Sequence, residues 1–379
     1  MCDPIFLNMR PDNFLLEKYM GIYEFSAPHL LCTSDCETIT VSELLSFEES
    51  AEKGLMDLGL GYTEARGGKE LREEISKLYE NISPDDIITF AGAEEGIFIF
   101  MNAVLSKGDH VIVQFPAYQS LYEIAKAIGC EVTLWEMNEE NGWRPDPDFL
   151  VKNIRKNTKA IVINSPHNPT GFNFSLEDFE KIVSIVRDRD LYLFSDEVYR
   201  LLEFDPKYRL PAAADIYEKG ISLGVMSKAF GLAGLRSGWV ATKDPLTLEK
   251  ISSLKDYTTI CSSAPSEYLA AVALRHRDRL VERNLGIIRK NLELLDAFMK
   301  RQSGLFEWVR PSAASIGFVK LRTGESAEAF CRDVVDETGV LLLPSTVYQF
   351  GDSHFRIGFG RKDMAECLEI LEKYLKNRY

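Results

Sequence analysis

The pattern of hydrophobic positions divides the chain into two parts. Between about residues 85 and 242, short apolar runs alternate with segments of helical periodicity, which is typical of a parallel sheet covered by helices on both faces. Several runs are almost continuously apolar, as strands buried on both faces are. The predicted strands are residues 87–90, 110–114, 131–136, 160–163, 191–194, 221–226 and 239–242.

Beyond Ser263 the periodicity changes. Apolar side chains recur every three or four residues from Val281 to Met299 and predict one long amphipathic helix. Strands are then expected at residues 315–321 and 355–358, with helices near 327–338 and 363–377, which together describe a smaller α+β unit. Residues 1–45 are apolar but only weakly periodic, so the pattern alone does not place them.

Charge and cysteine content narrow the possible partners. Lys and Arg number 44 against 58 Asp and Glu, a net charge of −14, which disfavours binding to nucleic acid or to an anionic membrane. No apolar stretch approaches the roughly 20 residues needed to cross a bilayer. The seven scattered cysteines do not resemble a disulfide framework, and residues 1–4 do not resemble a secretory signal. We therefore expect a cytoplasmic protein.

Three polar segments each follow one of the predicted strands. Residues 165–171 follow the fourth strand, residues 196–199 the fifth and residues 227–236 the sixth. The carboxyl ends of parallel strands lie at the same edge of an open sheet, which is where such sheets bind ligands. We therefore expect the three segments to meet in one site.

These segments carry an amide, a carboxylate, a phenol, an amine and a guanidinium. Each alone is a weak signal, because Pro/Gly/Asn loops are common turns and most lysines are solvated. Together they are the groups needed to hold pyridoxal phosphate: the amine forms a Schiff base, the carboxylate keeps the ring nitrogen protonated, and the phenol and amide bind the ring oxygen. The residues are Asn168, Asp196, Tyr199, Lys228 and Arg236.

In order and spacing, the three segments resemble those of the class I/II aminotransferases, which are pyridoxal phosphate enzymes of fold type I. The resemblance spans roughly residues 55–360. It implies an α/β fold with a large domain, whose mostly parallel seven-stranded sheet is covered by helices, and a smaller α+β domain made from the N-terminal segment and the C-terminal part. The expected parts are an N-terminal arm (residues 1–45), the large cofactor-binding domain (46–275) and the long helix with the small domain (276–379).

The resemblance also implies residue roles. Lys228 would be the Schiff-base lysine, Asp196 the partner of the pyridinium nitrogen, and Arg356 the clamp on the substrate α-carboxylate, a task suited to a bidentate donor. Tyr62 would reach the phosphate of the neighbouring subunit, which implies a homodimer with shared active sites. The other residues expected at the cofactor are Tyr199 and Asn168 on the ring oxygen, Tyr118 on the ring face, and Ser227, Arg236, Gly92, Ala93 and Glu94 at the phosphate.

The implied reaction moves the α-amino group of an L-amino acid to a 2-oxo acid, but three departures from the family pattern keep other reactions open. Ser34 stands where most members have a glycine that contacts the substrate carboxylate, and Val225 replaces a phosphate-binding serine. No arginine precedes residues 261–263, which disfavours a dedicated aspartate or glutamate transaminase. A lyase, cyclase or oxidase using the same cofactor therefore remains the alternative.

His29 lies close to Cys32 and Cys36, but this group lacks a clear fourth ligand, so we expect no metal site. If the segment lines the active site, as its match to the carboxylate-binding loop suggests, His29 and Ser34 contact the substrate. His167 lies inside the cofactor motif and is expected to point away from the site.

Overall fold

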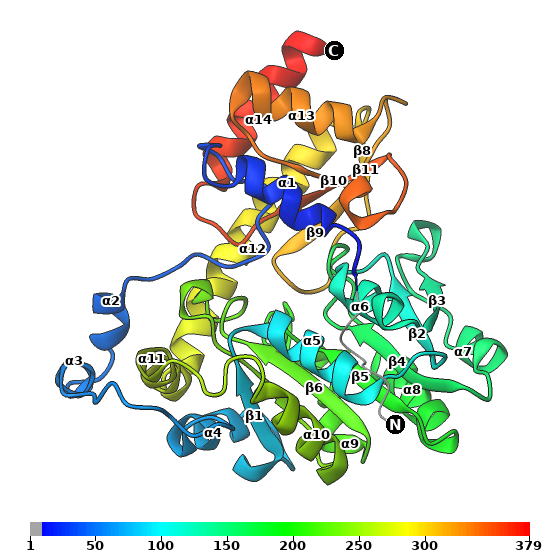
Figure 1. The fold of residues 1–379 in the computed structure, drawn as a ribbon. Coiled ribbons are helices and arrows are strands. Elements are labelled where there is room, and N and C mark those ends of the chain that lie inside the picture. The colour runs from blue at the N-terminus through cyan, green and yellow to red at the C-terminus, as the bar shows by residue number, and fades with distance from the viewer. Residues whose placement is uncertain (1–9) are drawn as a thin grey trace.

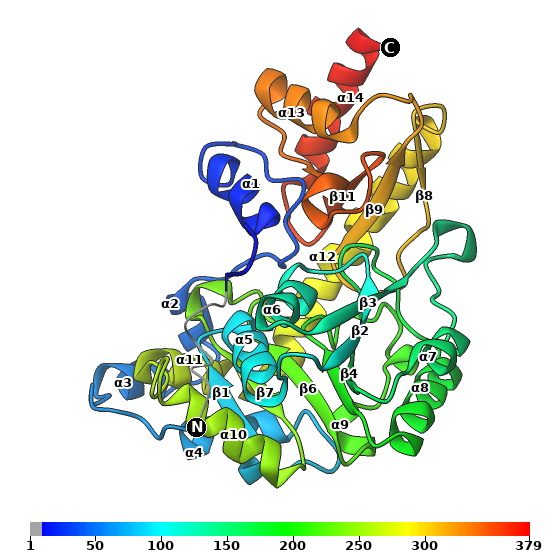
Figure 2. The same cartoon turned by 45° about the vertical axis from the view of Figure 1, so that its right-hand side comes forward.

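The computed structural model describes residues 10–379. Cys2 and residues 1–4, on which the prediction about a secretory signal rests, lie outside the described residues. The described chain forms two units, each with its own sheet, and the 25-residue helix α12 (Arg277–Arg301) runs from the larger unit into the smaller one (Figures 1 and 2).

The sheet of the larger unit contains all seven predicted strands, in the order β1-β7-β6-β5-β4-β2-β3. Strands β2 to β6 are parallel to one another, whereas β7 is antiparallel to both of its neighbours, β6 and β1. Their ends differ from the predicted ones by two residues at most. The bounds are β1 Ile87–Phe90, β2 His110–Phe115, β3 Glu131–Glu136, β4 Thr158–Asn164, β5 Tyr192–Asp196, β6 Gly220–Val225 and β7 Gly238–Ala241.

Helices cover both faces of this sheet, as the alternating pattern predicts. The consecutive residues Leu193 and Phe194 of β5 enter two different apolar clusters, because successive side chains of a strand point to opposite faces of the sheet. One cluster is closed by α7 (Asp148–Asn153), α8 (Leu176–Asp188) and α9 (Ala213–Ile216). The other is closed mainly by α5 (Ala93–Val104), α6 (Ser120–Ile128) and α10 (Pro245–Lys255).

Helix α8 shows how the sequence specifies one of these elements. The Ser175 hydroxyl accepts a hydrogen bond from the backbone N–H of Asp178 at 3.1 Å and so caps the helix start. Phe179, Ile182, Val183 and Val186 then form one buried stripe. The cap sets where the helix begins, and the stripe sets which side faces the sheet.

The smaller unit is built from both ends of the chain. Its antiparallel sheet has the order β10-β11-β9-β8, with α13 (Ala327–Thr338) and α14 (Met364–Arg378) packed on it. Helix α1 (Leu15–Tyr23) belongs to this unit, because Leu16 and Met20 share a core cluster with Phe318 and Tyr348. The strands are β8 Phe306–Trp308, β9 Ile316–Leu321, β10 Leu343–Pro344 and β11 His354–Gly358.

Strands β8 and β10 were not predicted, since three and two residues are too few to show an alternating pattern. The fold class is nevertheless the predicted one: a mostly parallel seven-stranded sheet covered by helices, with a smaller α+β unit that includes the N-terminal segment.

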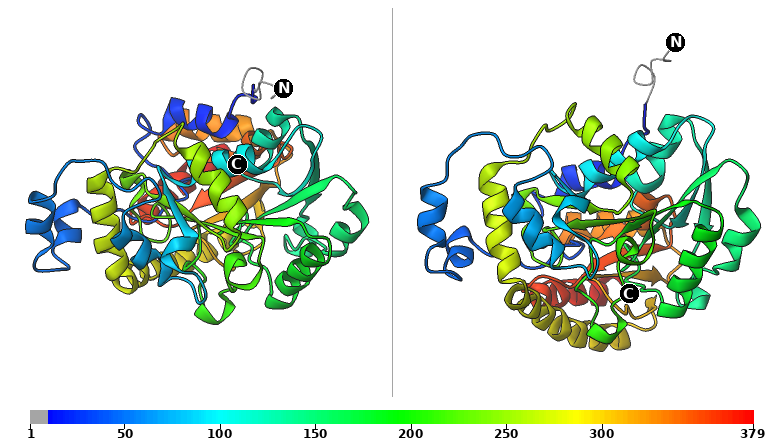
Figure 3. Two further views of the ribbon diagram at one scale, coloured as in Figure 1. Left: turned by 60° about the horizontal axis from the view of Figure 1, so that its bottom comes forward. Right: turned by 90° about the horizontal axis from the view of Figure 1, so that it is seen from below.

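Four helices lie at one side of the larger unit, and two of them, α2 and α3, project from its body (Figures 1 and 3). They are α2 Val41–Leu45, α3 Ala51–Met56, α4 Lys69–Ser76 and α11 Ala264–Arg275. Within residues 10–379, no helix is both long enough and apolar enough to span a membrane.

Helix α12 offers a direct test of the core, because Leu295 is fully buried whereas its neighbour Leu294 is 37% exposed. Leu295→Ala should lower the free energy of unfolding by about 2–5 kcal/mol, because it removes buried methyl groups and leaves a cavity. Leu294→Ala should cost less than about 1 kcal/mol. Urea unfolding of both variants measures the difference, and equal losses would contradict the described orientation of α12.

Candidate active site

A cavity of about 390 Å³ is lined by residues of both units. The larger unit contributes residues that follow β4, β5 and β6, and the smaller unit contributes α1, the segment around Ser34, and β11. Eleven of the predicted site residues line it: Ser34, Ala93, Glu94, Tyr118, Asn168, Asp196, Tyr199, Ser227, Lys228, Arg236 and Arg356.

The register of the parallel strands brings the three polar segments together. Asn164, the last residue of β4, pairs with Asp196, the last residue of β5, and Asp196 pairs in turn with Leu223 of β6. The strands therefore end at nearly the same level. Asp196 itself belongs to β5, whereas the sequence pattern ended that strand two residues earlier.

Lys228 follows β6 and points into the cavity. Its Nζ donates to the Ser34 hydroxyl at 2.8 Å and lies 5.7 Å from the centre of the Tyr199 ring. Burial lowers the pKa of Lys228, while the nearby carboxylate of Asp35 acts in the opposite direction. A lysine with a lowered pKa has a larger fraction of neutral amine, the form that reacts with carbonyl carbons.

Asp196 is 4% exposed and forms the base of the cavity. One carboxylate oxygen accepts from the backbone N–H of Val198 at 3.2 Å, and no ion pair engages it among residues 10–379. Burial raises the pKa of Asp196 to about 7. A buried carboxyl group without a cation is costly to ionise, so the site favours a ligand that brings a positive charge here.

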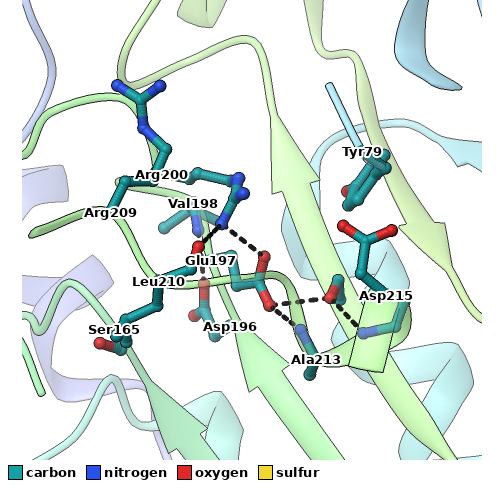
Figure 4. Close-up of polar contacts among 12 residues, drawn as sticks. Tyr79, Ser165, Asp196, Glu197, Val198, Arg200, Arg209, Leu210, Ala213 and Asp215 are labelled. Atoms are coloured by element: carbon teal, nitrogen blue, oxygen red, sulfur yellow. Dashed lines mark hydrogen bonds and ion pairs between the residues drawn. The ribbon is translucent and has the colours of Figure 1, made fainter. Parts of the chain in front are cut away.

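The neighbouring Glu197 points the other way and anchors the end of β5 (Figure 4). Its Oε1 accepts from the Ser222 hydroxyl at 2.8 Å and from the backbone N–H of Ala213 at 2.9 Å. Its Oε2 lies 3.7 Å from Nη1 of Arg200. Consecutive side chains at the end of a strand point to opposite faces of the sheet. Because these contacts fix Glu197 on one face, the side chain of Asp196 points to the other face, toward the cavity.

Asn168 and Arg356 are joined by Tyr348. The Asn168 side-chain oxygen accepts from the Tyr348 hydroxyl at 3.0 Å and from Nη1 of Arg356 at 3.2 Å. With its oxygen engaged, the amide has its Nδ2 left as a donor for a ligand. The loop that carries Asn168 is held against β4, because the backbone N–H of Asn168 donates to the side-chain oxygen of Asn164 at 2.6 Å.

Arg356 is 3% exposed, yet no carboxylate pairs with it in the described chain. Its Nε donates to the Cys32 carbonyl at 2.9 Å and its Nη1 to Tyr348 at 2.7 Å, which leaves Nη2 without an acceptor among residues 10–379. A buried guanidinium of this kind calls for an anionic ligand, and a planar carboxylate matches its geometry.

The start of α5 and Arg236 form a second anion cradle. Gly92 precedes the helix with a φ of 92°, and no side chain caps the helix N-terminus, so its first N–H groups are free to bind an anion. A Cβ on Gly92 would lie 2.5 Å from Nη2 of Arg236, so the guanidinium packs directly against the glycine. Arg236 has a φ of 47°, a left-handed conformation that is costly for a residue other than glycine.

Tyr118 and Glu94 lie at another wall of the cavity. The Tyr118 hydroxyl donates to Glu17 of α1 at 3.1 Å, and its ring packs on Phe14 with centroids 4.9 Å apart. Glu94 accepts from the Ser120 hydroxyl, and burial raises its pKa. The Tyr118 ring is thus fixed at its hydroxyl and on one face.

Four residues singled out in the sequence do not line the cavity, and one of them, Gly92, lies next to it at the start of α5. Tyr62 is 92% exposed and lies beside Ser262 at the side of the larger unit. His29 does not line the cavity, because its backbone pairs with Val340 and is bonded to residues on both sides of it. His167 is buried beneath its loop, where its ring nitrogens contact Thr170 and the Pro116 carbonyl at 2.8 Å each. Residues 10–379 contain no cluster of metal-ligating side chains around Cys32 and Cys36.

The residues of the cavity and its supports that the sequence analysis did not single out include Tyr348, Asp35, Glu17 and Glu24. Tyr348 holds Arg356, Asp35 lies near Lys228 and is paired with Arg361 at 2.7 Å, and Glu17 and Glu24 come from α1. None of them belongs to a segment that follows a parallel strand. Only their placement in the smaller unit brings them to the site.

The geometry defines a site for a ligand with an amine-reactive carbonyl, a cationic ring atom and a phosphate. Lys228, Asp196, and the cradle of Arg236 with the α5 N-terminus match those three features, which are the features of pyridoxal 5′-phosphate. Comparison with known proteins agrees. The family model described as "Aminotransferase class I and II" matches residues 31–373. The chain belongs to this family.

Individual relatives cover most of the chain. An aspartate aminotransferase of Pyrococcus horikoshii is 29% identical over 343 residues, 87% of each protein. Capreomycidine synthase of Streptomyces vinaceus is 27% identical over 350 residues, 92% of this chain and 88% of that protein. A crystal structure of a PLP-dependent aminotransferase from Streptococcus suis has a TM-score of 0.92 and 33% identity over 97% of this chain and 99% of that one.

The predicted family, enzyme class and cofactor are therefore confirmed. The protein is a PLP-dependent aminotransferase by family and fold, and its cofactor is pyridoxal 5′-phosphate.

Asp196 gives this site a measurable pH signature in the cofactor-free protein. Because its folded-state pKa of about 7 is above the ordinary value of 3.8, ionising it destabilises the fold, and stability is lost as pH rises from about 4 to 7. Asp196→Asn should remove this loss. The free energy of unfolding of the variant minus that of the wild type should therefore rise by up to about 4 kcal/mol between pH 4 and pH 8.

Urea unfolding of both cofactor-free proteins across this pH range measures the effect. Asp57→Asn, at an exposed position, is the control and should follow the wild type at every pH. A constant difference between wild type and Asp196→Asn would show that Asp196 keeps an ordinary pKa.

Proposed function

We propose that the enzyme transfers the α-amino group of an L-amino acid to a 2-oxo acid, with Lys228 as the Schiff-base lysine and as the proton carrier. One observation supports this most directly: the same cavity holds an amine with a lowered pKa, Lys228, and a buried guanidinium with no carboxylate partner, Arg356. Amino acids and oxo acids share the α-carboxylate that Arg356 would bind.

The proposed roles of the other residues follow from their contacts. Pyridoxal phosphate, when bound, supplies an aldehyde that condenses with amines and a pyridinium ring that accepts electrons from the substrate Cα. Asp196 would keep the ring nitrogen protonated, since a cation there relieves the cost of a buried carboxylate. Arg236, Ser227 and the α5 N-terminus at Gly92, Ala93 and Glu94 would hold the phosphate, and Tyr118 would cover the ring face.

Lys228 is placed to move a proton. As a free amine with a lowered pKa, its Nζ would act as the general base that takes a proton from the substrate Cα. Ser34, whose hydroxyl accepts from Nζ at 2.8 Å, would hold the free amine in place. Tyr199 and the free Nδ2 of Asn168 would contact the ring oxygen.

We further propose a homodimer with shared active sites in the cytoplasm. Leu60 and Tyr62 are 82% and 92% exposed and line one shallow hollow with residues 261–265, so two large apolar side chains lie together on the surface. Contact with a second copy would cover them and would bring Tyr62 toward the partner's phosphate site. The six cysteines of the described chain are all free, which fits a reducing compartment.

A lyase, cyclase or oxidase reaction is the second candidate, and the relationship to capreomycidine synthase favours keeping it. Purified enzyme loaded with cofactor, mixed with L-amino acids but no oxo acid, separates the two. A transaminase should release one equivalent of oxo acid per site and then stop. Ammonia, a cyclic product or oxygen uptake on repeated turnover would instead establish the second candidate.

Replacing Lys228 tests its proposed role. Lys228→Ala should abolish turnover, because both the Schiff base and the proton transfer require its amine. The measurements are transamination rate and the cofactor's absorbance spectrum. Turnover at the wild-type rate would refute the role.

Replacing Arg356 tests the proposed carboxylate clamp. Arg356→Gln should raise the KM for the amino acid by about 10²-fold, because a charge-assisted bidentate contact contributes about 3 kcal/mol. Arg356→Lys keeps the positive charge but loses the bidentate geometry, so its KM should lie between those of the wild type and Arg356→Gln. Affinity for pyridoxal phosphate, measured by fluorescence titration, should change little; an unchanged KM would refute the clamp.

A further inference from the structure

The cavity walls contain more carboxyl groups than cationic groups. Five carboxyl groups line it, those of Glu17, Glu24, Asp35, Glu94 and Asp196, against three cations, Lys228, Arg236 and Arg356. Under the proposed function, two of the cations bind the anionic groups of cofactor and substrate. Among the carboxyl groups, Asp35 is paired with Arg361 and Glu94 is bonded to Ser120. The two that remain besides Asp196 are Glu17 on α1 and Glu24, the C-cap residue directly after it.

Helix α1 presents these carboxylates on one face. Leu16, Glu17, Met20 and Glu24 line the cavity, and spacings of three, four and seven residues place side chains on the same side of a helix. The carboxylates lie two turns apart, about 10 Å along the axis, with the apolar Met20 between them. The face therefore combines negative charge with a surface suited to methylene groups.

Of the two carboxylates, Glu24 has fewer hydrogen-bond and ion-pair partners. Glu17 accepts from the Tyr118 hydroxyl, whereas the half-buried side chain of Glu24 has no hydrogen-bond or ion-pair partner in residues 10–379. Burial raises the pKa of Glu24, and the carboxylates of Glu17 and Asp35 raise it further, while the more distant cations Arg361 and Lys228 lower it less. A ligand cation would offset all three effects at once.

An independent feature indicates that a ligand reaches this wall. Arg356, 3% exposed and without a carboxylate partner, faces the same cavity, and Lys228 lies between the two units. With its α-carboxylate on Arg356 and its α-amino group at Lys228, an amino acid has its side chain left to contact the remaining walls, of which α1 is one.

We propose that α1 selects amino acids whose side chain ends in a cationic nitrogen group, an ammonium or a guanidinium, with Glu24 as its ion partner and Glu17 beside it. This inference rests on the proposed function. It also gives a reason to expect poor binding of aspartate and glutamate, because no unengaged cation remains in the cavity for a second carboxylate.

Pairs of amino acids that differ in charge but little in shape test the proposal. L-Arginine is compared with L-citrulline, and L-lysine with L-norleucine; L-aspartate is the anionic reference. Each is mixed with the cofactor-loaded enzyme in a stopped-flow instrument without oxo acid, and the apparent Kd is taken from the initial change in cofactor absorbance. At least one cationic member should bind about tenfold more tightly than its neutral counterpart.

The two pairs distinguish the cation types, because a preference in the lysine pair indicates an ammonium and one in the arginine pair a guanidinium. The preference should fall when NaCl is raised from 0.05 to about 0.5 M, because the contact is an ion pair in a cavity open to solvent. Equal affinities within both pairs would overturn the proposal.

Variants assign the preference to α1. Glu24→Gln should reduce the ratio of the two apparent Kd values from about tenfold to less than about threefold. The control Glu369→Gln removes one charge from an exposed position of α14 and should keep the wild-type ratio. A wild-type ratio in Glu24→Gln would overturn the role of Glu24.

Failure of the proposed function gives a different result. In that case no amino acid yields one equivalent of oxo acid per site, whether or not the cofactor absorbance changes, whereas a transaminase that lacks only the cationic preference releases oxo acid from charged and neutral members alike. Thermal unfolding with each amino acid provides a second readout, since a ligand that binds the folded state raises the Tm.

Discussion

The common level at which β4, β5 and β6 end is the constraint on which the site depends. Asn164, Asp196 and Leu223 are neighbours in register, so the segments that follow these strands start from the same edge. Residues separated by more than 60 positions in the chain, such as Asn168 and Arg236, therefore line one cavity. A slip of one residue in β5 would turn Asp196 to the opposite face and place Glu197 toward the cavity. The bonds of Glu197 to Ser222 and Ala213 work against such a slip.

Charges buried without counterions are the second organising feature. Asp196 and Arg356 lie on opposite units, each almost fully buried and neither paired with an opposite charge in the described chain. Such groups lower the stability of the protein alone, and that cost is recovered when ligands of matching charge bind. The site is therefore prepared for a cation at one end and an anion at the other. Arg236, next to the α5 N-terminus, adds a second place for an anion.

How far the sequence predicted this molecule depended on the length and repetition of each signal. The seven strands of the larger sheet were predicted because they are apolar runs between helical segments, and Asn168, Asp196 and Lys228 were placed in one cavity because they follow those strands. Helix α1 was not placed, because its nine residues give only two and a half turns of pattern within a weakly periodic apolar segment. Tyr348 lies on a short turn and gave no pattern at all. His29 was linked to the substrate through an aligned segment, but the backbone pairing of His29 with Val340, visible only in three dimensions, places it elsewhere.

The origin of the cavity walls from two units has an evolutionary consequence. The groups facing the expected cofactor, Lys228, Asp196 and Arg236, all belong to the larger unit, whereas α1, with Glu17 and Glu24, belongs to the smaller one. Mutations in α1 leave the strand register and the contacts that hold Asp196 and Arg236 intact, although Glu17 also bonds Tyr118. A duplicated gene could thus acquire a new substrate range through a few changes in a nine-residue helix near its start, while the inherited chemistry stays under separate selection.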